Sequence, residues 1–361
     1  AGILSQKPPR ALVMPHAVAL SDKEAAALEA YVRGGGTLVA DVRPALADGN
    51  CNLRPRPALE ELFGVERPAG EGKPAKLDVS FEDAAEGKGM DVSLPPMAVP
   101  GLTLDSAVNI AAGRPLGKGG ETPAFIVTRV GKGAAVLLNF SFHEYRSTPG
   151  PNGERPLFEL ARALFGATGI RPQWQLLDVS GTPLPGGRVS AFTHGGCQIL
   201  GALPPATENR KAPVPATIIA PHRAHLYDLR ASKYLGEADR VKADLRFASA
   251  TVLSALPYRV TALDVRAPRS VKAGTACEVR MRLRAVGDTT RAKPVIRLTV
   301  LGPDGEEQWF YARTLYPEGL EASASIPFAL NDTPGQWLIV CRDVLTGTRT
   351  TAKVSVEEAS R

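Results

Sequence analysis

The chain has 361 residues, of which 44% are hydrophobic, 22% charged and 6% aromatic, and its formal net charge is +6. At about 100–200 residues per domain, this length predicts two or three domains, and the mixed composition excludes a disordered chain. No run of about 18 uncharged apolar residues is present, so the sequence predicts no membrane span. The basic residues are scattered, without the stripe and interleaved aromatic residues of a nucleic-acid binder, so we expect no nucleic-acid partner.

Residues 10–41 predict a strand, a helix and a second strand. The apolar run Ala11–Met14 ends at a proline, as a buried parallel strand can. Ser21 and Glu24 have the spacing of a capping box, and apolar residues at helical spacing follow them. The triple glycine at 34–36 supplies the left-handed residue that ends a helix, and Thr37–Ala40 is the next apolar run. Together these elements have the length of a right-handed βαβ unit.

The rest of the first predicted domain, which we end at residue 171, is less regular. Residues 43–121 predict a long excursion with small strands. The runs Phe125–Val130 and Ala134–Phe140, joined by a glycine-rich tripeptide, predict a hairpin. Apolar residues at helical spacing predict a helix over 154–166. Residues 1–171 are therefore expected to be α/β with an open sheet.

Beyond residue 172 the helical period disappears, and short apolar runs alternate with turns. Residues 172–260 predict a small β-sandwich whose runs are Val189–Phe192, Gln198–Leu200, Ala216–Ile219, His225–Leu229 and Ala250–Leu253. Residues 261–361 predict an immunoglobulin-like sandwich with runs at Cys277–Leu283, Val295–Leu301, Trp309–Ala312, Ser325–Ala329, Trp337–Arg342 and Thr350–Val356. The chain is expected to be α/β and then all-β, in three domains.

The four cysteines are widely separated and form no CxxC pair, which disfavours a structural zinc site. Cys277 and Cys341 lie on strand-like runs of one predicted sandwich; we favour two buried free thiols, with a disulfide as the alternative. No GxSxG elbow is present. Cys197 follows two glycines, but strand residues follow it in turn, so we expect no nucleophile there.

Cofactor and metal motifs are also weak. The glycines at 34–36 follow a helix and precede a strand, which is the reverse of a dinucleotide-binding loop. His222 and His225 are three residues apart, which on a strand places them on opposite faces. We therefore predict no cofactor and no metal site.

Polar residues follow three predicted parallel strands, whose carboxyl ends meet at one sheet edge, where ligands gather in open α/β sheets. These residues are His16, Asp41, Arg43, His143, Glu144, Tyr145 and Arg146. Two interpretations are open: a polar pocket, or side chains that cap strands and pair across a domain interface. We favour the second.

One set of motifs points to a family. The set comprises Leu12-Val-Met-Pro15, Leu20-Ser21, Tyr31-Val32, Gly35-Gly-Thr-Leu-Val39, Asp41, Gly131-Lys-Gly133, Leu138-Asn-Phe140 and Tyr145. Together these motifs, over residues 10–168, resemble the trimerisation domain of family 42 β-galactosidases, which is similar to a class I glutamine amidotransferase without its catalytic cysteine. The resemblance implies a flavodoxin/amidotransferase-like open sheet whose first strand and helix are missing before Arg10. The family's catalytic glutamates lie on an upstream (β/α)8 barrel, so no catalytic residue carries over.

Three functions follow as hypotheses. The first is a non-catalytic assembly region of a glycoside-hydrolase-like protein, with a homo-oligomer or an upstream catalytic barrel as partner. The second is a carbohydrate-binding or cell-surface interaction array, with Trp309, Tyr311 and Trp337 as candidates for sugar stacking. Aromatic residues in sandwich strands are more often part of the core, and we favour that role for these three. The third is a small hydrolase with a site near His143 and Glu144. We expect a processed or truncated soluble chain, and a secreted or cell-surface bacterial location is left open.

Overall fold

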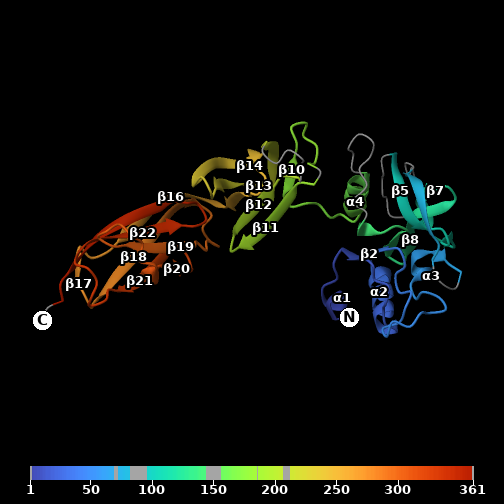
Figure 1. Ribbon diagram of the computed structural model, residues 1–361, viewed down its shortest axis with the longest axis horizontal. Helices are drawn as coiled ribbons and strands as arrows, with labels where there is room; N and C mark the ends of the chain where they lie inside the picture. Colours follow the sequence, from blue (N-terminus) through green and yellow to red (C-terminus); the bar gives the residue numbers. More distant parts are fainter. Residues whose placement is uncertain are drawn as a thin grey trace. The chain divides into compact units, whose positions relative to one another are not determined.

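The computed structural model describes residues 2–68, 72–81, 96–143, 156–184, 186–205 and 212–359. The chain divides into two compact units, Ala1–Arg171 and Pro172–Arg361. The first is α/β and the second is all-β, which confirms the fold class expected from the sequence (Figure 1). The further division at residue 260 stays a prediction. Within the described ranges, no helix is both long and apolar enough to cross a bilayer.

The first unit is built on one open sheet of seven strands, in the order β1-β2-β9-β8-β7-β4-β5. Its elements are α1 (Gly2–Gln6), β1 (Ala11–Met14), α2 (Asp22–Arg33), β2 (Thr37–Asp41), α3 (Glu60–Phe63), β3 (Val65–Glu66), β4 (Pro74–Phe81), β5 (Met97–Asp105), β6 (Asn109–Ile110), β7 (Arg114–Gly119), β8 (Thr122–Val130), β9 (Gly133–Leu138) and α4 (Pro156–Ala167). Strands β1, β2 and β9 run parallel, and the others join antiparallel.

The predicted βαβ unit is present. The Ser21 hydroxyl accepts the N–H of Glu24, and the Glu24 carboxylate accepts the N–H of Ser21, which completes the capping box of α2. The left-handed residue after the helix is Gly35, with φ of 118°. Gly36 packs so closely on Tyr31 that an added Cβ would lie 2.2 Å from the tyrosine ring. The triple glycine therefore ends the helix and lets it pack against the next strand.

Helices cover both faces of this sheet (Figure 1). Helices α2 and α3 pack their buried residues, such as Leu28 and Phe63, against one face. Helix α4 packs Leu157, Leu160 and Leu164 against the other. The central strands β8 and β9 are almost wholly buried because both of their faces are covered.

The expectation of a loose excursion over residues 43–121 is wrong in one respect. Three of its strands, β4, β5 and β7, extend the main sheet by antiparallel pairing. Leu77, Val79 and Phe81 alternate along β4 and pack into the core of the α4 face. This period of two is the signal of a half-buried strand.

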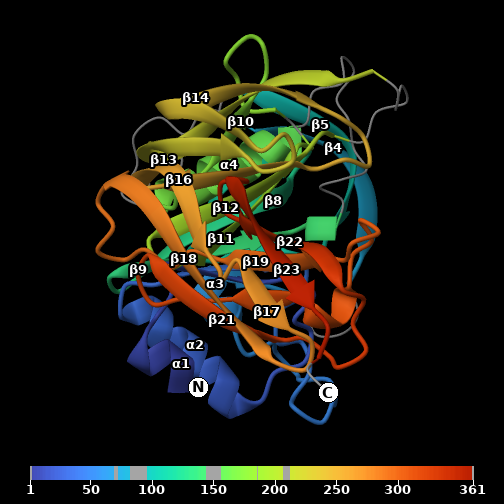
Figure 2. The same ribbon diagram turned by 90° about the vertical axis from the view of Figure 1, so that its left-hand side faces the viewer.

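The second unit begins with a six-stranded sheet in which β13 and β14 lie side by side along their whole length (Figures 1 and 2). Its strands are β10 (Gln175–Leu177), β11 (Arg188–His194), β12 (Cys197–Leu203), β13 (Val214–Asp228), β14 (Lys233–Leu245) and β15 (Thr251–Leu256). The two strands expected at 216–219 and 225–229 are one strand, β13, interrupted by a bulge between Ile219 and Ala224. Strand β14 was not predicted. It lies at the sheet edge, and apolar and polar residues alternate only over its last part, from Val241 to Leu245.

The last part is a sandwich of a three-stranded sheet, β16-β18-β21, and a five-stranded sheet, β17-β23-β22-β19-β20. Its elements are β16 (Tyr258–Arg266), β17 (Ser270–Lys272), β18 (Ala276–Gly287), β19 (Ile296–Leu301), η2 (Trp309–Tyr311), β20 (Arg313–Leu315), β21 (Glu321–Pro327), β22 (Gly335–Asp343) and β23 (Arg349–Glu357). The strand expected at Trp309–Ala312 is wrong: its first three residues form the 3-10 helix η2. Cys277 and Cys341 are buried and free.

A buried carboxylate lies where this sandwich meets the six-stranded sheet. Asp343 is fully buried, and it accepts hydrogen bonds from the Thr346 hydroxyl at 2.5 Å and the Leu345 N–H at 3.4 Å. The Leu345 carbonyl in turn accepts from the Ser254 hydroxyl. Burial raises the pKa of Asp343 to about 6.

Replacing Asp343 by asparagine tests this burial. An unfolded aspartate has a pKa of about 3.9, so the folded state binds the proton more tightly, and this group's contribution to stability is lost as pH rises through about 6. Between pH 4 and pH 7 the free energy of unfolding should shift by roughly 2 kcal/mol in favour of Asp343→Asn relative to the wild type. Urea unfolding at several pH values measures this difference, and a difference that does not change with pH would contradict it.

Candidate functional site

The candidate polar edge forms where three parallel strands end. Strands β1, β2 and β9 are neighbours in register, with Met14 beside Ala40 and Asp41 beside Leu138. The chain leaves β1 through His16, which has a left-handed φ of 50°. The loops after β1 and β9 therefore meet at the carboxyl end of β2.

Asp41, the last residue of β2, holds these loops together. Its side chain is 1% exposed. One carboxylate oxygen, Oδ1, accepts the backbone N–H of His16 at 2.6 Å, and Oδ2 accepts the backbone N–H of Phe142 at 2.8 Å. Each carboxylate oxygen thus serves a backbone donor from a different loop. Hydrogen bonds of this kind, with a charged acceptor, are among the stronger ones in proteins.

The side chains of Ser141 and His16 contact each other beside this carboxylate. The His16 Nε2 lies 2.6 Å from the Ser141 Oγ and 3.6 Å from the Asp41 Oδ2. Sequence reasoning missed Ser141, although it directly follows the Asn139-Phe140 pair that ends the β9 segment. A serine, a histidine and an aspartate are thus gathered here.

Their geometry is not that of a catalytic triad. In a triad the carboxylate binds Nδ1 of the imidazole, which leaves Nε2 free to take the proton of the serine. Here Asp41 and Ser141 both approach Nε2 of His16. With both groups at the same nitrogen, Asp41 does not hold the imidazole in the way that a triad carboxylate does. The Ser141 hydroxyl accepts the His143 N–H at 3.2 Å, which fits a loop-ordering role.

The pocket beside this cluster is open and shallow. It has a volume of about 460 Å³ and is lined by Pro15, His16, Ser141, Phe142 and His143. The His16 side chain is 59% exposed there. The remaining residues expected at this edge, Glu144, Tyr145 and Arg146, lie outside the described residues.

Arg43, expected at the same edge, takes part in a different cluster. Its Nε donates to the Asp105 Oδ2 at 2.9 Å. The Arg67 Nε lies 3.6 Å from the same Asp105 oxygen, and its Nη1 lies 3.7 Å from the Glu60 Oε1. Its Nη2 donates to the Val42 carbonyl at 2.6 Å. This network of two arginines and two carboxylates ties the segment after β2 to β5.

The two carboxylates of that network pair with its two arginines. Burial acts to raise the pKa of Asp105, but N–H groups of Lys73 and Ala107 and the Arg43 guanidinium outweigh it and lower that pKa below its ordinary value. Burial raises the pKa of Glu60, partly offset by Arg67. Both carboxylates therefore serve to hold buried arginines.

The remaining predicted residues are scattered. Cys197 is fully buried, and burial raises the pKa of its thiol, the opposite of what a nucleophile needs. Tyr311 and Trp337 are 5% and 3% exposed, whereas Trp309 is 78% exposed. Of these three candidates for sugar stacking, Tyr311 and Trp337 belong to the core, and Trp309 presents its ring to solvent. Across the described part of the chain, no group of three or more His, Cys, Asp or Glu side chains is placed to hold a metal ion.

No protein-family model and no curated protein matches this sequence. Among solved structures, a β-galactosidase from Bacillus circulans sp. alkalophilus is similar at 14% identity over 70% of this chain and 34% of that chain, with a TM-score of 0.49. A GH42 β-galactosidase from G. stearothermophilus is similar at 16% identity over 69% and 32%, with a TM-score of 0.47. A β-galactosidase from Rahnella sp. R3 is similar at 13% identity over 69% and 32%, with a TM-score of 0.48.

The aligned region thus spans about a third of the length of these enzymes. Similarity at this level assigns no activity to the present chain.

Substitutions at the polar edge test whether Asp41 stabilises the fold more than Ser141 and His16 do. Asp41→Ala leaves two partly buried N–H donors without an acceptor, which should cost roughly 1–3 kcal/mol of unfolding free energy. Ser141→Ala and His16→Ala remove side chains that are not required by those donors, so each should cost less than about 1 kcal/mol. Chemical denaturation measures all three variants. Equal losses for Asp41→Ala and Ser141→Ala would contradict the role given to Asp41.

Proposed function

We propose that this chain is a non-catalytic assembly region of a glycoside-hydrolase-like protein of the β-galactosidase kind, and that its first unit packs against neighbouring subunits. The observation that carries the proposal is the open edge of β1. This strand pairs with β2 on one side, and no strand in the described part of the chain pairs with its other side.

The backbone pattern of β1 identifies the groups at that edge. The Thr37 N–H donates to the Arg10 carbonyl. Because hydrogen-bonding groups alternate along a strand, Arg10, Leu12 and Met14 face β2, and the N–H groups of Ala11 and Val13 point to the open side. Such an edge is a template for another chain.

The side chains of β1 are also incompletely covered. All four are half-buried, although the strand is wholly apolar. By contrast, every residue of the neighbouring strand β2 is buried. A partner at the open edge would cover apolar surface as well as satisfy the backbone groups, and burial of apolar surface is the main favourable term in association.

Two further observations support an assembly role. The carboxylate at the polar edge binds backbone N–H groups, as a strand cap does. The motifs of residues 10–168 resemble a trimerisation domain, which supports the context of a larger glycosidase. The parent protein's catalytic apparatus belongs, on this proposal, to another part of that protein.

Light scattering after size exclusion tests the proposal. We expect the wild-type chain to form oligomers at tens of micromolar, with a mass that is a multiple of 38.2 kDa. Ala11→Pro removes one outward N–H at a position where proline suits an edge strand, and should weaken association at least tenfold. Ala11→Val keeps the N–H and serves as the matched control. A wild-type chain that stays monomeric at every concentration would overturn the proposal.

A second candidate function, carbohydrate binding, rests on Trp309. Its indole is 78% exposed and is held edge-on against Phe310, with ring centroids 5.9 Å apart. An exposed aromatic face of this kind can stack on a sugar ring. On a glycan array, Trp309→Ala should abolish any binding that the wild type shows, whereas Phe192→Ala, at another exposed aromatic residue, should leave it intact. Binding that survives Trp309→Ala would exclude this role.

A further inference from the structure

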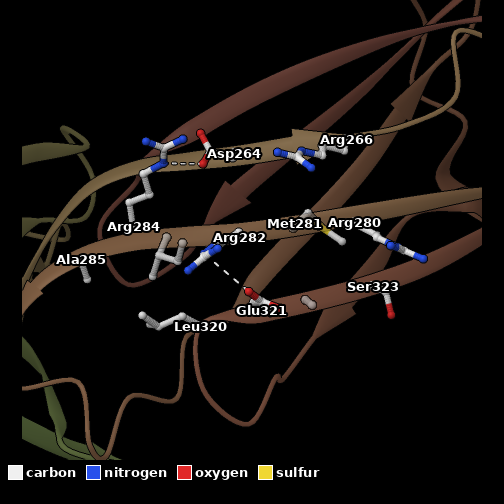
Figure 3. A pocket seen from close by; sticks show the side chains of 12 residues that line it. Asp264, Arg266, Arg280, Met281, Arg282, Arg284, Ala285, Leu320, Glu321 and Ser323 are labelled. Atoms are coloured by element: carbon white, nitrogen blue, oxygen red, sulfur yellow. Dashed lines mark hydrogen bonds and ion pairs between the residues drawn. The ribbon is translucent and has the colours of Figure 1, made fainter.

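The outward face of the three-stranded sheet β16-β18-β21 forms a broad groove of about 1140 Å³ (Figure 3). We call it the arginine groove, because its floor carries Arg266 on β16 and Arg280, Arg282 and Arg284 on β18, accompanied by Asp264 and Glu321. The arginines of β18 alternate with the buried residues Met281 and Leu283, so all three side chains point to the same face.

The two carboxylates of the groove are already paired. Asp264 accepts from the Nε of Arg284 at 2.5 Å, and Glu321 lies 3.5 Å from the Nε of Arg282 (Figure 3). In the described part of the chain, no carboxylate lies within ion-pair distance of Arg266 or Arg280. The groove therefore carries two positive charges in excess.

Strand register makes these two arginines direct neighbours across the sheet. Arg266 is the direct cross-strand partner of Arg280, and Arg280 is the direct partner of Ser323 on β21. Directly opposed side chains have Cβ atoms about 4.5–5.5 Å apart, and like charges in that position repel. In Figure 3 the two guanidinium groups extend away from each other. An anionic group seated over the two strands would draw both toward it and accept hydrogen bonds from both of them.

The next set of cross-strand partners along the sheet, which we call the next row, contains two carboxylates. It consists of Asp264, Arg282 and Glu321, which are also direct cross-strand partners. Two residues along a strand correspond to about 6.6–6.8 Å. One row therefore suits an anionic group, and the neighbouring row offers carboxylate oxygens that accept hydrogen bonds from hydroxyl groups.

We propose that the arginine groove binds an acidic oligosaccharide, with one carboxylate or sulfate group held by Arg266, Arg280 and the Ser323 hydroxyl, and with sugar hydroxyls facing Asp264 and Glu321. A nucleic acid fits less well, because its next phosphate would meet those carboxylates. The groove lining also contains no aromatic side chain on which bases could stack. The site does not depend on the assembly role of the first unit.

Calorimetric titration of the full chain tests the site. The probe is a hexamer of galacturonic acid, which is carboxylated, and its fully methyl-esterified form is the neutral control. A sulfated galactan oligomer compares the two acidic groups, and an oligothymidylate of equal charge tests charge alone. The variant Arg266→Gln/Arg280→Gln removes the excess charge. Arg297→Gln, on the exposed face of β19 in the other sheet, is the matched control.

We expect the wild type to bind the galacturonate or the sulfated oligomer at least tenfold more tightly than the neutral ester and the oligothymidylate. The double variant should lose at least tenfold in affinity, and Arg297→Gln should stay within twofold of the wild type. Arg266→Lys/Arg280→Lys keeps the charge without the planar fork, and should bind with intermediate affinity. Absence of binding to both acidic oligomers, equal binding of oligothymidylate, or an affinity unchanged in the double variant would overturn the proposal.

Discussion

The hydrogen bonds of the Asp41 carboxylate are the constraint on which the first unit depends. A single buried side chain accepts backbone N–H groups from the loops that follow β1 and β9, and thereby joins the carboxyl ends of three parallel strands. In many open α/β sheets this edge holds a ligand. Here the carboxylate binds the backbone, and Asp41 and Ser141 both approach the same imidazole nitrogen of His16. The Asp41 carboxylate therefore orders this edge instead of binding a ligand there.

Because the Asp41 carboxylate is bound to the backbone, we place the interaction surfaces elsewhere. The first unit presents the open side of β1, a short apolar strand whose neighbour β2 is wholly buried. The second unit presents the arginine groove, where strand register opposes two arginines without an acid between them. One surface suits a β-strand of a partner chain, and the other suits a ligand that carries both anionic groups and hydroxyls. Neither surface requires reaction chemistry in the described residues.

Much of this architecture is predictable from sequence where local signals agree. The capping box at Ser21, the triple glycine and the period-two runs of the sandwich each specify one element, and each is present. The failures have physical causes. Strand β14 lies at an edge, and only residues 241–245 of it alternate apolar and polar side chains. Trp309–Tyr311 is apolar but short and helical. Arg43 follows β2 as closely as a site residue would, yet it binds Asp105, 62 residues away. No spacing rule could reveal that pairing, or the approach of Ser141 to His16.

The most direct test of the assembly account is hydrogen–deuterium exchange of the β1 amides as a function of protein concentration. If the open edge is an interface, the amides of Ala11 and Val13 should exchange at least tenfold more slowly at high concentration than at low concentration. The amides of Leu12 and Met14, which face β2, should be protected at both. Rapid exchange of Ala11 and Val13 at every concentration would contradict the account.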